Sequence, residues 1–108
     1  MRIELKSPHL QMDQALQDYV AMRLSKLAKL VESLEEQEEL ICFVELARTT
    51  HRHRKGESLY YAEATLQVPG TRLRCEETAS DIRKAIDQLQ ETLEREVNKY
   101  KAKKVAKR

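Results

Sequence analysis

YYAEATLQVPGTRLRC, the sequence of residues 60–75, is the part of the chain from which the fold is most readily inferred. Apolar and polar residues alternate over 60–68 and again over 72–76, on either side of Pro69-Gly70. A period of two is typical of β-strands with one buried face, and a proline-glycine pair is typical of a tight turn. The stretch therefore predicts two antiparallel strands joined as a hairpin.

A helical pattern follows the hairpin and ends in a basic tail. Apolar residues recur every three or four positions, the period of an amphipathic helix. They are Ile82, Ala85, Ile86, Leu89, Leu93, Val97 and Tyr100. Thr78 or Ser80 is the predicted N-cap of this helix. From Arg95 to Arg108 seven basic residues accompany Glu96 alone, although the formal net charge of the chain is only +2. Such concentrated positive charge makes a polyanion the first partner to consider.

Two strands and one helix are predicted in the first half of the chain. Ile3 and Leu5 alternate with charged residues and indicate the first strand, which ends at Ser7-Pro8. A helix begins after Asp13, its predicted N-cap. Its apolar stripe consists of Leu16, Val20, Leu24, Leu27, Val31 and Leu34. Residues 40–47 predict the second strand, because they are too few for a helix and rich in strand-forming residues.

The predicted order is β-α-β-β-β-α, an α+β fold with a four-stranded mixed sheet. A strand-helix-strand unit makes the first two strands parallel through a right-handed crossover, and short connections make the last two antiparallel. Both helices then cover one face of the sheet and run parallel, so that their C-terminal halves lie at the same end. We expect a single domain over residues 1–102 and a basic C-terminal tail over residues 103–108.

The composition is that of one small domain. The chain has 108 residues, of which 41% are hydrophobic and 35% are charged, and its mean hydropathy is -0.69. No apolar run approaches the roughly 20 residues that span a bilayer, so a membrane is not an expected partner. Residues 1–6 alternate apolar and charged side chains without a hydrophobic signal segment. A cytoplasmic location is therefore the default expectation.

Neither a metal site nor a catalytic centre is expected. His51 and His53 alternate with arginines that would repel a cation, and zinc would need further ligands. Cys42 and Cys75 fall on inward-facing strand positions and should pack as free thiols. The sequence has no glycine-rich phosphate loop and no nucleophile beside an evident base. We therefore expect no enzymatic activity and no cofactor.

Basic residues of the two helices are expected to form one surface. Arg23, Lys26 and Lys29 follow one flank of the first helix in its second half, at 100° per residue. Because the helices run parallel, this group should converge with the basic tail on a surface broad enough to follow a phosphate backbone. The open face of the sheet is predicted to carry Phe43, Tyr61, Arg72 and Arg74. Such side chains can stack RNA bases, but cross-strand packing is the commoner explanation.

The chain resembles the bacterial family of ribosome hibernation-promoting factors and ribosome-associated inhibitors across nearly its whole length. Four ordered segments carry the similarity: VAMRLSKLAK at 20–29, YAEATL at 61–66 before Pro69-Gly70, DIRKAID at 81–87 and LEREVNKYK at 93–101. The resemblance implies a protein that occupies the decoding channel of the small ribosomal subunit, where messenger RNA and tRNA anticodon arms otherwise bind. Such a protein keeps idle ribosomes inactive.

The resemblance also implies which residues of a ribosome-binding domain would contact ribosomal RNA. The family's contacts would fall on Arg23, Lys26, Lys29, Arg95, Lys99 and Lys101. Four more basic residues of the second helix and tail complete the candidate set: Arg83, Lys84, Lys103 and Lys104. Arg83-Lys84 departs from the usual family pattern, in which an aromatic and a small residue are commoner. The sequence ends after the basic tail, whereas long members continue into a dimerisation domain, so a short, monomeric member is expected.

Two other functions fit the same residues. Strands and helices in similar numbers also build general double-stranded RNA-binding domains. The third hypothesis is a regulator, for instance of transcription, that binds other proteins through the acidic stretch at 32–45 or the open sheet. Binding to free duplex RNA, or a protein partner retained after nuclease treatment, would distinguish these functions from ribosome binding.

Overall fold

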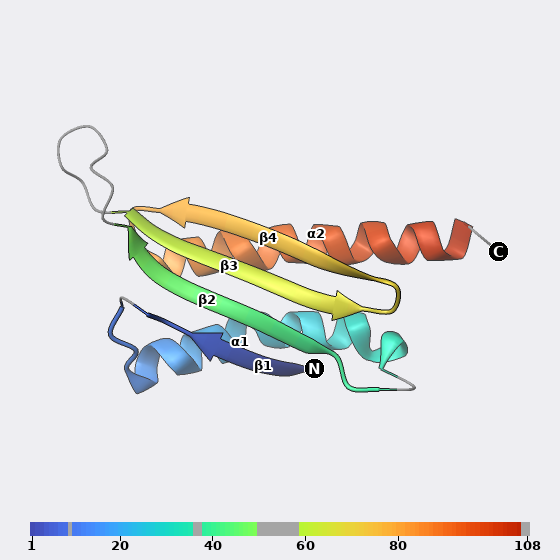
Figure 1. Cartoon of the computed structure of the whole chain (residues 1–108), viewed down its shortest axis with the longest axis horizontal. Helices are drawn as coiled ribbons and strands as arrows, with labels where there is room; N and C mark the ends of the chain where they lie inside the picture. The colour runs from blue at the N-terminus through green and yellow to red at the C-terminus, as the bar shows by residue number, and fades with distance from the viewer. Residues whose placement is uncertain (9, 36–37, 50–58, 107–108) are drawn as a thin grey trace.

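Four strands and two long helices follow the predicted order. The structure is a computed structural model that describes residues 1–8, 10–35, 38–49 and 59–106. Its elements are β1 (Arg2–Lys6), α1 (Gln14–Val31), a 3-10 turn η1 (Glu32–Leu34), β2 (Ile41–Thr49), β3 (Leu59–Val68), β4 (Thr71–Ala79) and α2 (Ile82–Ala106) (Figure 1). The α+β fold predicted from the sequence is thus confirmed. The sequence predicts a loop over residues 49–58, but β2 continues through Thr49. Residues 50–58, which include the histidines, and the last two residues of the basic tail lie outside the described residues.

The strands form one sheet in the order β1-β2-β3-β4. β1 pairs with β2 in parallel, and the other two pairs are antiparallel, as predicted. Gly70 in the β3-β4 turn has a φ of 86°, a left-handed conformation that glycine adopts without steric cost. The pairing of Ala64 with Cys75 sets the hairpin register, which directs the apolar residues of both strands to the same face.

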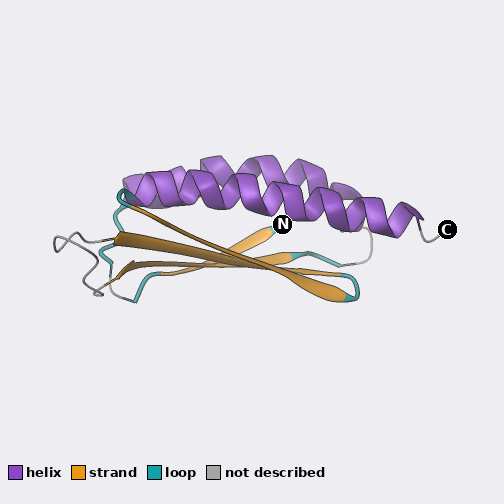
Figure 2. Ribbon diagram, turned by 90° about the horizontal axis from the view of Figure 1, so that it is seen from above, coloured by secondary structure: helices purple, strands orange, loops and turns teal. Residues whose placement is uncertain are grey.

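Both helices lie on one face of the sheet and run in the same direction (Figures 1 and 2). This arrangement follows from the β1-α1-β2 crossover and from the strand directions, and it confirms the predicted parallel helices. The C-terminal part of α2 projects past the β3-β4 turn (Figure 1). Because α2 continues to Ala106, Lys103 and Lys104 belong to the helix.

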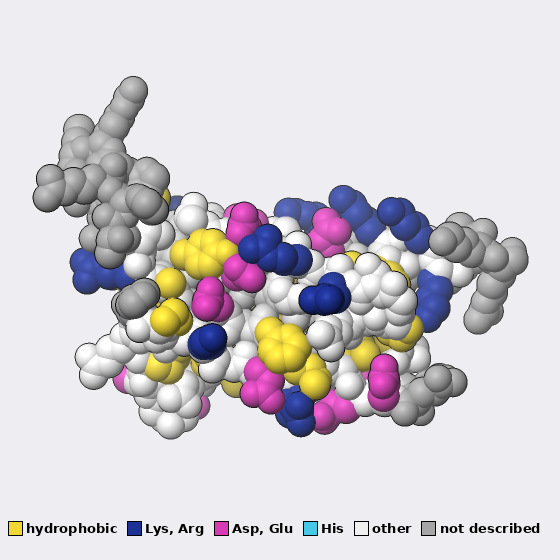
Figure 3. Space-filling model, viewed as in Figure 1, with side chains coloured by type: hydrophobic (Ala, Val, Ile, Leu, Met, Phe, Trp, Pro, Cys, Tyr) yellow, Lys and Arg dark blue, Asp and Glu magenta, His cyan; other side chains and the backbone are white. Residues whose placement is uncertain are grey.

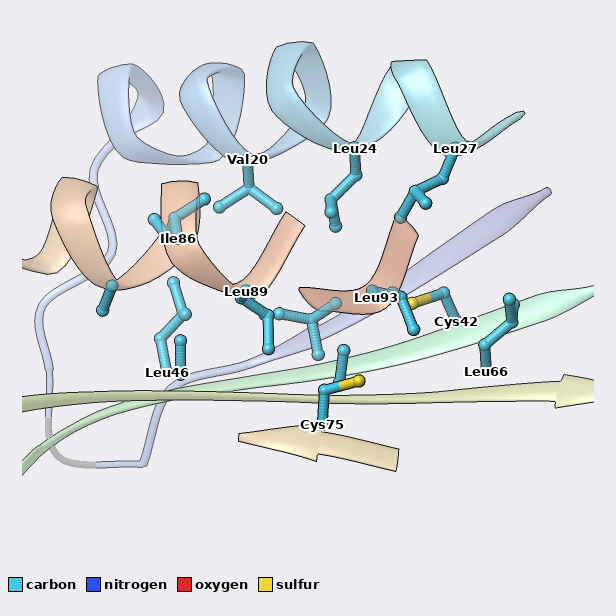
Figure 4. Packing of buried hydrophobic residues seen from close by; sticks show 14 of the residues in the cluster. Val20, Leu24, Leu27, Cys42, Leu46, Leu66, Cys75, Ile86, Leu89 and Leu93 are labelled. Carbon is cyan, nitrogen blue, oxygen red and sulfur yellow. The ribbon is translucent and has the colours of Figure 1, made fainter. Parts of the chain in front are cut away.

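The core fills the space between the helices and the sheet (Figure 4). The two apolar helical stripes supply about half of its residues, and the inward side chains of the strands supply most of the rest. Its largest fully buried members are Leu24, Leu27, Leu46, Leu66, Ile86, Leu89 and Leu93. Burying a leucine contributes roughly 1.5–3 kcal/mol, so this layer is the main source of stability. Cys42 and Cys75 are free, buried thiols, as expected.

The N-terminal caps of the helices show one confirmed and one wrong prediction. The carboxylate of Asp13 accepts a hydrogen bond of 2.8 Å from the Leu16 amide and caps α1 as predicted. Neither Thr78 nor Ser80 caps α2, because β4 continues through Ala79 and α2 begins only at Ile82. Asp81 takes that role, and its carboxylate accepts a hydrogen bond of 2.8 Å from the Arg83 amide.

Candidate nucleic-acid interface

The C-terminal halves of the two helices are held together at one end of the domain. The ammonium group of Lys101 on α2 donates a hydrogen bond of 2.9 Å to the carbonyl oxygen of Leu30 in the last turn of α1. Helix C-termini leave carbonyl groups unpaired and carry partial negative charge, so a lysine is well suited to this position. The contact brings the basic residues of α1 next to those of α2, as the topology predicted.

Several candidate residues project freely from this layer. Lys26 and Lys29 on α1 are exposed, and so are Lys84 and Lys103 on α2. None of these four ammonium groups forms an ion pair within the described ranges. Blue side chains of lysine and arginine gather where α2 projects past the hairpin (Figure 3). These charges are available to an external anion.

Arg23 has a different environment from Lys26 and Lys29. Its guanidinium donates a hydrogen bond of 3.0 Å to the side-chain oxygen of Gln90 on α2. Its Nε lies 3.0 Å from Asp87 Oδ1. The two groups form an ion pair, but this Nε makes no hydrogen bond of good geometry. Only about a fifth of the Arg23 side chain is exposed (21%). Arg23 therefore joins the two helices, and its charge is already balanced by Asp87.

Asp87 is the centre of a polar cluster between the helices. The Tyr19 hydroxyl donates a hydrogen bond to it, and this bond is the main reason why the pKa of Tyr19 is raised. The Arg83 guanidinium lies over the Tyr19 ring, 5.4 Å from its centroid. Gln90, a buried polar residue, donates in turn to Glu94. This cluster was not predicted from the sequence. In the sequence its residues are only polar residues on the flank of an amphipathic helix, a pattern that does not indicate which of them contact each other.

The remaining candidates on α2 make weaker contacts. Arg95 donates a hydrogen bond of 3.3 Å to the Thr92 hydroxyl, one turn earlier. Lys99 lies 3.6 Å from Glu96 and is exposed, so this pair contributes little to stability. Lys104 lies over the ring of Tyr100, 5.6 Å from its centroid. All three side chains can reorient toward a phosphate at small cost.

The open face of the sheet carries charges of both signs (Figure 3). Phe43 and Arg74 are exposed there, as predicted. Arg74 forms ion pairs of 3.1 and 3.2 Å with Glu63 and Glu76. The Tyr61 hydroxyl donates a hydrogen bond to Glu63, which is the main reason why the pKa of Glu63 is lowered, and its oxygen lies 2.8 Å from the carboxylate of Glu76. These internal pairs make the face a poorer match for RNA than the helix layer, and base stacking there stays a prediction.

The described residues also bear on a metal site and on a membrane-spanning helix. No group of three or more histidine, cysteine or acidic side chains in 1–8, 10–35, 38–49 and 59–106 is arranged to hold a metal ion. His51 and His53, weighed as metal ligands in the sequence, lie outside these ranges. In the part of the chain that the structure describes, no helix is long and apolar enough to cross a membrane.

Comparison with known proteins identifies the family. The model of the family described as sigma 54 modulation protein / S30EA ribosomal protein matches residues 3–105. The chain belongs to this family, which confirms the resemblance inferred from the sequence. Family members are ribosome-binding factors and not enzymes, in agreement with the expected lack of enzymatic activity.

Individual relatives agree with this assignment. The ribosome hibernation promoting factor of Acinetobacter guillouiae is 25% identical over 94% of this chain and 88% of its own length. The ribosome hibernation promotion factor of Lactococcus lactis is 28% identical, but the chain spans only 50% of that protein. The crystal structure of the Thermus thermophilus protein Y N-terminal domain superimposes with a TM-score of 0.71 at 29% identity, covering 93% of this chain and 99% of that one. A ribosomal subunit interface protein from Coxiella burnetii has the same fold, with a TM-score of 0.73 at 18% identity over 94% of this chain and 99% of that one.

Proposed function

We propose that this protein is a ribosome hibernation factor that binds the decoding channel of the small ribosomal subunit. It contacts ribosomal RNA through the exposed basic residues of α1 and α2. It occupies the space of messenger RNA and tRNA anticodon arms, and so inhibits translation sterically, without covalent chemistry. It acts as a monomer in the cytoplasm, where ribosomes are found.

The observation that carries this proposal is the Lys101–Leu30 contact between the helix ends. It holds two separate groups of cations at one end of the helix layer, where a phosphate backbone can contact both. Lys26 and Lys29 form the first group, and Arg95, Lys99 and Lys103 form the second. Contacts of this kind release condensed counterions and dominate the affinity of proteins for nucleic acids. Two relatives with hibernation in their names support the choice of the ribosome as the partner.

Charge reversal on the helix layer tests the proposal. The double variant Lys26→Glu/Lys29→Glu should lose binding to purified small subunits in cosedimentation, because both residues are exposed and unpaired among the described residues. The matched control is Lys6→Glu/Arg72→Glu, which makes the same change in charge at two exposed positions on the open sheet. We expect at least a tenfold weaker affinity for the first variant and a change below about threefold for the control. Equal effects of the two variants would contradict an RNA contact through the helices.

Competition experiments test the place of binding. Anticodon stem-loops of tRNA together with a short messenger RNA should displace the protein from small subunits, and the protein should inhibit their binding in return. Free duplex RNA can also be added as a competitor. If it displaces the protein from small subunits as effectively as unlabelled small subunits do, the result would instead support a general double-stranded RNA-binding domain. Undiminished binding in the presence of saturating tRNA and messenger RNA would exclude the decoding channel.

A further inference from the structure

A hollow at the projecting end of α2 combines apolar and positively charged side chains. It lies between the β3-β4 turn and the helix, with a volume of about 410 Å³, within the roughly 300–1,000 Å³ typical of small-ligand pockets. It is lined by Pro69, Gly70, Thr71, Tyr100, Lys103 and Lys104. Apolar surface, two hydroxyls and two ammonium groups therefore meet in one concave place.

Its walls are held in place by a contact between two elements. The Tyr100 hydroxyl donates a hydrogen bond of 2.6 Å to the carbonyl oxygen of Pro69 and so fixes the tyrosine ring against the turn. Gly70 borders open space on the turn side of the hollow, since a Cβ atom at this position would have no atom within 4 Å. The aromatic ring and the proline thus offer a rigid, accessible surface to a planar group.

The hollow at Tyr100 differs in charge from two other hollows on the protein. The hollow beside Phe43 is lined by Glu4, Glu45 and Glu63, and the one beside Arg72 is lined by Glu38 and Glu39. No carboxylate lines the hollow at Tyr100. An anion is therefore attracted to this hollow and repelled by carboxylates at the other two.

We propose that this hollow binds one unpaired nucleotide of an RNA strand. The base packs against Tyr100 and Pro69, and the ammonium groups of Lys103 and Lys104 contact the adjoining phosphates. Lys104, which lies 5.6 Å from the centroid of the Tyr100 ring, moves from the ring to a phosphate when the base enters. Aromatic stacking accepts any base, so the site recognises unpaired RNA without selecting its sequence. This inference rests on the proposed function and adds a contact with single-stranded RNA at one end of the basic surface.

Titration with short RNAs tests the site directly. Addition of a five-uridine RNA to ¹⁵N-labelled protein should shift the amide resonances of Gly70, Thr71 and Lys103 in NMR spectra. An oligomer of the same length with abasic positions should bind about tenfold more weakly, since it keeps the phosphates and loses the stacking. Equal affinity for the two oligomers, or shifts that leave residues 70 and 71 unaffected, would overturn the proposal. Uridine monophosphate should bind more weakly than the five-uridine RNA; equal affinity would indicate a free nucleotide as the ligand.

Two substitutions of Tyr100 separate the ring from the hydroxyl. Tyr100→Leu keeps an apolar side chain and removes the aromatic surface, and it should weaken binding of the five-uridine RNA about tenfold. Tyr100→Phe keeps the ring and should retain the affinity within about threefold. An equal loss in both variants would show that only the structural bond to Pro69 matters and would overturn the stacking role.

The proposed function and the nucleotide site can fail separately. Wild-type protein that does not sediment with small subunits would contradict the proposed function. Wild-type protein that sediments with small subunits but binds the intact and abasic oligomers equally would contradict the nucleotide site alone.

Discussion

Arg23 on α1 and Asp87 on α2 form an ion pair, with 3.0 Å between Nε and Oδ1. The pair lies between the helices, next to the hydrogen bonds of Tyr19 and Gln90. Its partners face each other only because both helices pack side by side on one face of the sheet. A residue that family resemblance assigns to RNA binding therefore also fixes the helix layer that carries the exposed lysines.

The Arg23–Asp87 pair should contribute measurably to folding stability. Arg23→Met keeps the apolar stem and removes the charge. We expect it to lower the free energy of unfolding by about 1–2 kcal/mol, because Asp87 loses its ion pair and the Gln90 side-chain oxygen loses its donor. Urea denaturation of Arg23→Met, Asp87→Asn and the double variant should give a coupling energy of about 0.5–1 kcal/mol, limited by the partial exposure of Asp87. Strict additivity of the two single effects would show that the pair is energetically unimportant.

The same pair should contribute little to the salt dependence of RNA binding. The double variant Arg23→Met/Asp87→Asn removes one charge of each sign and should leave the slope of log affinity against log salt unchanged. Lys26→Met removes an exposed, unpaired cation and should reduce the slope by about 0.7–0.9, the value for one phosphate contact. The slopes can be measured by cosedimentation with small subunits between 50 and 300 mM salt. A loss of slope in the double variant as large as in Lys26→Met would assign a phosphate contact to Arg23.

Lys101 should have a structural role that Lys99 lacks. Lys101→Met removes the hydrogen bond to the Leu30 carbonyl and should lower the free energy of unfolding by about 1 kcal/mol. Lys99→Met removes only an exposed contact with Glu96, and its effect should stay within about 0.5 kcal/mol. Thermal or urea denaturation of the two variants side by side provides the measurement. Equal stability of both variants would mean that the bond between the helix ends is not maintained in solution.

The two thiols should be unreactive in the folded protein. Burial raises the pKa of Cys42 to about 12 and that of Cys75 to about 11, from 9.0. At pH 8 the thiolate fractions are then on the order of 10⁻⁴ and 10⁻³, so alkylation by iodoacetamide should be at least about 100-fold slower than in urea. Since folding raises both pKa values, the stability that the thiols contribute is fully present below about pH 9 and is lost as the pH rises toward 11 and 12. Rapid alkylation of both cysteines without denaturant would contradict their burial.

The sequence predicts the fold well where the spacing of apolar residues shows which face of a strand or helix is buried. The alternation around Pro69-Gly70 identifies the hairpin, and the stripe from Leu16 to Val31 identifies α1, because each pattern depends on one buried face. The cap of α2 was not predicted correctly, since pairing of Tyr60 with Ala79 extends β4 beyond the alternating stretch. That pairing is a tertiary interaction, which local propensity does not contain.

The sequence predicts where the candidate site lies, but it does not predict the contacts of its individual side chains. Chain topology places the C-terminal halves of the helices together, which the bond between Lys101 and Leu30 confirms. Charge alone cannot distinguish Arg23 from Lys26, because the difference arises from Asp87, a residue distant in sequence that forms an ion pair with Arg23. The hollow at Tyr100 likewise needs the fold, since the turn and the helix end that form it are far apart in sequence.

Cleavage of RNA by a tethered iron chelate can show whether the helix layer faces ribosomal RNA in the decoding channel. Met22→Cys places a reactive thiol on α1 at a position that is 57% exposed, near Lys26, and Gln67→Cys places one on the open sheet. The buried native thiols should remain unmodified, so each variant carries a single chelate.

When each labelled protein is bound to small subunits, we expect hydroxyl radicals from position 22 to cleave ribosomal RNA that lines the messenger RNA and tRNA sites. Cleavage there from position 67 should be weaker. Strong cleavage from position 67 with none from position 22, or cleavage confined to RNA outside the decoding channel, would show that the helix layer does not face these sites.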